Sequence, residues 1–131
     1  MRNTGLIEVN DLGTVTNLPN DCFRYCTRLT HINLPETCIK IGKGVFWDCN
    51  SLSFDLNDLY YVQEFDGNRE RGCLEINSNN GIPINYPDND KVLYLPNATK
   101  IGARSFRHHS MKEINLPNLN VISCHATFAN C

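Results

Sequence analysis

The sequence has no long apolar run and no excess of positive charge, and each absence excludes a class of protein. Its 131 residues contain no stretch of eighteen apolar residues, so we predict no membrane-spanning helix. Lys and Arg number 12 against 14 Asp and Glu; this balance argues against nucleic acid as a partner, because surfaces that bind nucleic acid are usually basic. The first five residues lack the apolar segment of a secretory signal. The length predicts one domain over residues 1–131.

The sequence also lacks any Cys-x-x-Cys pair, which argues against a zinc ribbon and a thioredoxin-like redox centre. Its seven cysteines are an odd number, so they cannot all form disulfides within the chain. Other groups of potential ligands are Cys124-His125 with Cys131, the pair His108-His109, and Asp88-Asn89-Asp90. None has a recognised spacing for zinc or calcium. We therefore predict no metal site and no cofactor.

What the sequence does contain is a short pattern that recurs about every 23 residues. One copy reads Leu29-Thr30-His31-Ile32-Asn33-Leu34-Pro35, then Ile41-Gly42, then Phe46-Trp47-Asp48-Cys49. Another begins at Met111 and ends in Phe128-Ala129-Asn130-Cys131; a third covers 93–109, and a weaker one covers 6–26. A period of 20 to 30 residues is typical of a solenoid, in which stacked copies bury a core that no single copy could build.

Elementary chemistry explains each part of the pattern. Apolar residues at alternate positions, such as Ile32 and Leu34, predict a short strand with one buried face. The proline that follows removes the next backbone donor, so the strand ends there. The Ile-Gly pair allows a tight return, and the Phe-x-x-Cys segment fills the far side of the turn. We therefore expect buried, inert thiols at Cys26, Cys49 and Cys131.

These residues resemble the BspA-like class of leucine-rich repeat, over positions 6–56 and 92–131. The resemblance implies a leucine-rich-repeat solenoid of the α/β repeat class. It would have five or six turns, mostly short parallel strands and loops, one parallel sheet and little helix. Members of that class are mostly surface or secreted modules that bind proteins or mediate adhesion. One departure is His109, which stands where the pattern has cysteine.

The middle of the chain, at about 57–91, breaks the pattern. Leu74-Glu75-Ile76-Asn77 is predicted to form another strand of the stack. Turn residues and prolines surround it, so we interpret 66–72 and 78–91 as loops that leave the stack.

Residues that alternate with the buried ones should point outward on the sheet. In the predicted strands these outward positions include four carboxylates and neither Lys nor Arg. Such a stripe could attract a protein partner with a basic patch. The alternative is that the asparagines only bond along the stack while the acids solvate the face. The predicted partner-binding residues are Glu8, His31, Asn33, Asp55, Glu75, Tyr94, Glu113 and Asn115.

These features favour a non-catalytic protein-binding or adhesion module over an enzyme, because Cys124 and His125 are sequence neighbours, which rarely lets a nucleophile and a base converge in a cleft. Two alternatives stay open: a structural component of an assembly, such as a virion, fibre or self-stacking repeat, and a small inhibitor of one partner protein. The last copy ends in mid-pattern without a polar cap, which predicts self-association through the C-terminal end. The resemblance implies a cell-surface or secreted protein, whereas the missing signal leaves a virion or the cytoplasm open.

Overall fold

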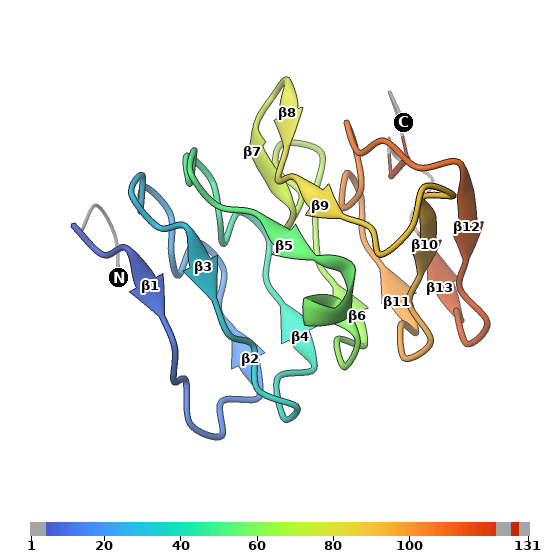
Figure 1. Ribbon diagram of the computed structural model, residues 1–131, viewed down its shortest axis with the longest axis horizontal. Coiled ribbons are helices and arrows are strands. Elements are labelled where there is room, and N and C mark those ends of the chain that lie inside the picture. Colours follow the sequence, from blue (N-terminus) through green and yellow to red (C-terminus); the bar gives the residue numbers. More distant parts are fainter. Residues whose placement is uncertain (1–4, 123–126, 129–131) are drawn as a thin grey trace.

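The computed structural model of the chain describes residues 5–122 and 127–128, and it is a solenoid of five coils (Figure 1). Each coil carries a short strand on each of two opposite sides, with the core between them, and β9 (Ile84–Asn85) is an additional strand on one side. In the described part of the chain the helical structure is one 3-10 turn, η1 (Leu56–Leu59), and no helix there is long and apolar enough to cross a membrane. The predicted solenoid with little helix is confirmed.

One side, which we call face two, is a continuous parallel sheet with one strand from every coil. In chain order its strands are β2 (Asn17–Leu18), β4 (Lys40–Ile41), β6 (Glu64–Phe65), β11 (Lys100–Ile101) and β13 (Val121–Ile122). Their register stacks like positions, so that Ile41 lies between Leu18 and Phe65. All three side chains are buried. The prediction of a single parallel sheet was wrong. The Ile-Gly segment was expected to be a turn, but it forms the sheet of face two, in addition to the predicted strands on the opposite side.

The opposite side, face one, carries the strands predicted from the Ile-x-Leu-Pro segments (Figure 1). Its strands are β1 (Glu8–Val9), β3 (His31–Ile32), β5 (Phe54–Asp55), β9 (Ile84–Asn85), β10 (Val92–Tyr94) and β12 (Glu113–Asn115). They pair in parallel as β1 with β3, β5 with β9, and β10 with β12. Face one is therefore interrupted where face two is continuous.

The chain reverses direction at a corner with two left-handed residues. Such corners lie between β2 and β3, between β4 and β5, and between β11 and β12. Asp21, Gly44 and Arg104 have φ near +60°, and Tyr25, Asp48 and His108, four residues further on, have similar values. The left-handed region costs an L-residue about 1–2 kcal/mol, so packing has to offset that cost. Between the two left-handed residues, the phenylalanine of each corner points into the core and is buried.

Phenylalanine rings form much of the core. Phe23 stacks on Phe46 of the next coil with ring centroids 6.3 Å apart, and Phe46 meets Phe54 edge-on at 5.4 Å. Further along the stack, Phe65 and Phe106 lie 5.2 Å apart. The repeated corner phenylalanine therefore supplies contacts between successive coils.

Coil 3 has no corner of this kind. An insertion over residues 66–83 replaces it, with β7 (Glu75–Asn77) and β8 (Asn80–Gly81) as an antiparallel hairpin. Leu74 and Ile82 are fully buried and fill the core in place of the missing phenylalanine. The prediction that 74–77 forms a face-one strand was wrong. The prediction that all of 78–91 is loop was also wrong, because β9 pairs with β5.

Candidate functional site

Seven of the eight residues predicted to bind a partner lie on face one. Six of these are exposed, and His31 is half-buried. The exposed ones are Glu8, Asn33, Asp55, Tyr94, Glu113 and Asn115. Periodicity alone placed these side chains correctly, because alternate residues of a strand point to opposite sides.

Near the N-terminus of face one the outward side chains bond to one another. The ring Nε2 of His31 lies 2.7 Å from Oδ1 of Asn33, and Asn10 donates to Glu8 Oε2 at 3.2 Å. Asn33 also donates across coils to the backbone oxygen of Asn10 at 3.4 Å. Part of the asparagine pattern is thus accounted for by bonding along the stack, the alternative that the sequence left open.

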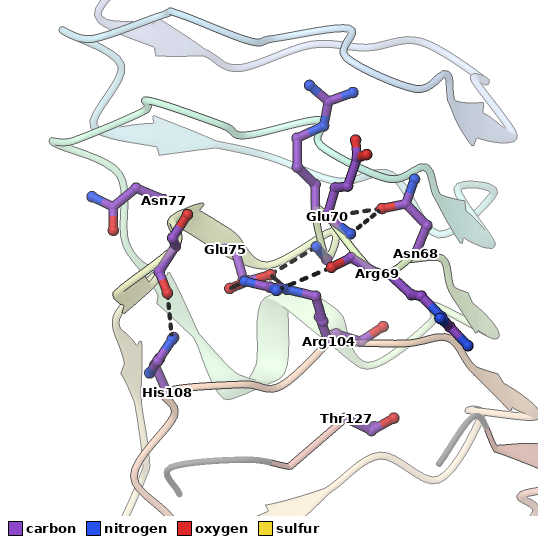
Figure 2. A network of polar contacts seen from close by, with 12 residues as sticks. Asn68, Arg69, Glu70, Glu75, Asn77, Arg104, His108 and Thr127 are labelled. Carbon is purple, nitrogen blue, oxygen red and sulfur yellow. Dashed lines mark hydrogen bonds and ion pairs between the residues drawn. The ribbon is translucent and has the colours of Figure 1, made fainter. Parts of the chain in front are cut away.

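Glu75, the eighth predicted residue, is not on face one. Its side chain is fully buried in the insertion, where Arg104 Nε donates to Oε1 at 2.8 Å and Arg104 Nη2 to Oε2 at 3.1 Å (Figure 2). The backbone N–H of Gly72 donates to the same Oε1 at 2.9 Å, and Arg104 also donates to the carbonyl of Arg69 at 3.1 Å. This bidentate ion pair compensates the carboxylate charge of Glu75, which would otherwise be costly to bury. Glu75 is therefore a structural residue.

The corner of coil 4 holds the insertion at two further points. The Nε2 of His108 lies 2.9 Å from the carbonyl oxygen of Ser78, and the Nε2 of His109 lies 2.9 Å from that of Ile82. His109 fills the cysteine column and is buried, as expected. Burial lowers its pKa below the ordinary histidine value. His108 is half-buried against the insertion.

Sequence reasoning missed this arrangement, although two signals were present. His109 departs from the repeat because its ring reaches the carbonyl of Ile82, which a cysteine side chain is too short to do. Arg104 is a long cationic residue at a left-handed position, where coil 2 has Gly44. Together they indicate that coil 4 contacts something outside the repeat.

Without Glu75, the outward carboxylates of face one are Glu8, Asp55 and Glu113. Two exposed lysines, Lys91 and Lys112, precede β10 and β12, and the backbone N–H of Lys112 donates to the carbonyl of Lys91 at 3.0 Å. The acidic character of face one is therefore weaker at the coil 4–5 end than the sequence indicated.

Cys38, Cys49 and Cys73 are buried free thiols. Cys49 donates from Sγ to the carbonyl of Phe23 at 3.1 Å, and burial raises its pKa to about 12. Such a thiol is a packing element with little reactivity. Within the described residues no group of three or more His, Cys, Asp or Glu side chains could hold a metal ion. The expected buried thiol at Cys131 and the ligand candidates Cys124 and His125 lie outside those residues.

The outermost strands of coil 5 expose apolar side chains that are buried in coil 4. Ile114 and Ile122 are 42% and 44% exposed, whereas Leu93 and Ile101, their partners in register, are fully buried. This end of the described stack therefore presents apolar surface.

Comparison with known proteins agrees with the repeat pattern. A family model described as BspA type leucine rich repeat region, with six copies, matches residues 2–70 and 88–131. The unmatched stretch between them contains the β7–β8 hairpin and β9. Searches of the curated proteins and of the solved structures gave no match.

Proposed function

Because the chain belongs to the BspA-type leucine-rich repeat family, we propose that it is a non-catalytic protein-binding module whose contact surface is face one. The observation that carries this proposal is the row of exposed polar side chains on successive strands, from Glu8 through Asn33 and Asp55 to Asn115. A solenoid presents such a row as one extended surface. Tyr94, 45% exposed, adds an aromatic side chain of the kind that anchors protein interfaces.

The partner that fits this surface best is a protein with a basic patch. Glu8, Asp55 and Glu113 supply the attraction, and exposed charges of this kind change the association rate more than the final affinity. Adhesion at a cell surface is the finer form of the proposal, and it rests on the resemblance to the family.

Site-specific photo-crosslinking tests face one. A photoreactive phenylalanine analogue at Asn33 should capture a protein partner, and the Glu8→Lys, Glu113→Lys double variant should form that adduct more slowly. The matched control carries the same analogue at Lys100, which is exposed on face two. An equal yield of the same adduct from Lys100, or no effect of the charge reversals, would contradict the proposal.

A second candidate is a component of an assembly, and the exposed Ile114 and Ile122 favour it. Here the apolar end of coil 5 would stack on another copy of the chain. Light scattering under reducing conditions would show an average mass that rises with concentration, and Ile122→Glu would abolish the rise. A constant monomer mass would remove this candidate.

A further inference from the structure

Face one is open between β9 and β10. Strand β9 pairs with β5 and β10 pairs with β12, and within residues 5–122 no hydrogen bond joins β9 to β10. Figure 1 shows β9 standing apart from β10 on this side. On face two the same coils are joined directly, because β6 pairs with β11. The strand β9 is thus an extra strand on face one, and it has no counterpart on face two.

The register shows which backbone groups face the opening. Phe54 donates to the carbonyl of Pro83, and Leu95 donates to that of Asn115. Alternate residues of a parallel strand bond to opposite sides. The N–H and C=O of Ile84 therefore point toward β10, and those of Val92 and Tyr94 point toward β9.

A cleft of about 270 Å³ lies between β9 and the corner of coil 4, next to the start of β10. Its apolar wall includes Pro83 and Ile84, and its polar groups include Lys91, Ser110 and the two histidines of the coil 4 corner. No carboxylate lines it. A second cleft of about 240 Å³ shares Tyr86 with the first and continues past Asn85 to Asp55.

Two contacts fix coil 3 and its insertion relative to coil 4. The buried Glu75–Arg104 pair joins the insertion, which leads into β9, to the corner of coil 4. Face two fixes the spacing of coils 3 and 4 through β6 and β11. The other interruption of face one, between β3 and β5, differs because the N–H of Asp55 is already satisfied by Asp58 Oδ2 at 2.8 Å.

We propose that an extended segment of a partner protein adds as a β-strand between β9 and β10, with an apolar side chain against Ile84 and an acidic side chain against Lys91. Unpaired strand edges are the groups that strand addition uses, and side-chain pockets along the edge give the specificity. Lys91 lines a cleft that contains no carboxylate. An acidic side chain of the partner would therefore complement its positive charge. The inference rests on the proposed function only in taking the partner to be a protein.

The test is selection of binders from a display library of random linear peptides against the whole chain. Enriched peptides should be rich in β-branched residues and carry one acidic position. Tyr94→Pro deletes the N–H that faces the opening and leaves the bonds between β10 and β12 in place, a position that tolerates proline. It should abolish binding, whereas the matched control Tyr94→Val should retain it. Both variants are first compared with wild type by circular dichroism and thermal unfolding.

Lys91→Glu tests the charge. It should weaken the binding of peptides with an acidic position by about fivefold, the upper end of what one exposed ion pair contributes. Amide shifts on peptide titration should concentrate at Ile84, Val92 and Tyr94. The inference is overturned if no peptide is enriched, or if folded Tyr94→Pro binds as well as Tyr94→Val. If the wild-type chain binds no peptide while crosslinking at Asn33 is intact, the strand addition alone is rejected and the proposed function stands.

Discussion

Removing the buried carboxylate of Glu75 is the most informative perturbation of the fold. In Glu75→Ala the guanidinium of Arg104, whose residue is 9% exposed, keeps its buried place without its partner. The N–H of Gly72 also loses its acceptor. Breaking a buried pair by deleting one partner costs about 3–5 kcal/mol, and we expect a free energy of unfolding lowered by that amount.

Urea denaturation measures this cost, with Glu113→Ala as the matched control because Glu113 stands in the same Glu-Ile-Asn tripeptide but is exposed. The control should change stability by less than about 0.5 kcal/mol. The double variant Glu75→Leu, Arg104→Met should recover most of the loss, since an apolar pair of similar size does not leave a charge unpaired.

Limited proteolysis separates local opening of the insertion from global unfolding. If the pair mainly fastens the insertion, Glu75→Ala should be cut within 66–83 under conditions in which the coils stay intact. A Glu75→Ala variant within about 1 kcal/mol of wild type, with unchanged proteolysis, would refute the reasoning.

Three further predictions concern buried groups and backbone space. Burial lowers the pKa of His109 from its ordinary 6.5, so its contribution to stability is complete above pH 6.5 and is lost as the pH falls below it. His109→Cys should flatten the fall in urea midpoint below pH 6.5, and identical slopes would contradict this. In the folded protein, Cys22, which is half-buried, should react with iodoacetamide before Cys49 does, because burial raises the pKa of Cys49 to about 12; equal rates by mass spectrometry would oppose it. Gly67→Ala should destabilise far more than Gly13→Ala. A Cβ at Gly67 would overlap a backbone carbonyl of coil 4, whereas Gly13 has open space and only a φ of +60°, a strain of about 1 kcal/mol. Thermal unfolding compares the two.

Periodicity predicted the regular coils because their side chains alternate between core and solvent over many copies. Ile32 and Phe46 are buried where the pattern put them, and Asn33 and Asn115 are exposed. Each such position depends mainly on the next copy of the same pattern, so local sequence is sufficient information there.

The insertion could not be predicted in the same way, because its residues depend on partners far along the chain. The tripeptide Glu-Ile-Asn occurs in β7 and in β12, yet Glu75 is buried and Glu113 is exposed. Arg104, 29 residues away, decides the difference. Strand β9 follows Pro83 in a segment rich in turn residues, and its pairing with β5 outweighs that local preference.

The most direct test of the account is amide hydrogen exchange of the free chain, measured by NMR at β9 and β10. The open face one predicts fast exchange at Ile84, Val92 and Tyr94, next to slow exchange at Leu93, whose N–H and C=O bond to β12. Ile101 of face two, held between two neighbouring strands, should also exchange slowly. Equal protection of Tyr94 and Leu93 would mean that β9 and β10 are joined, and would contradict an open binding surface there.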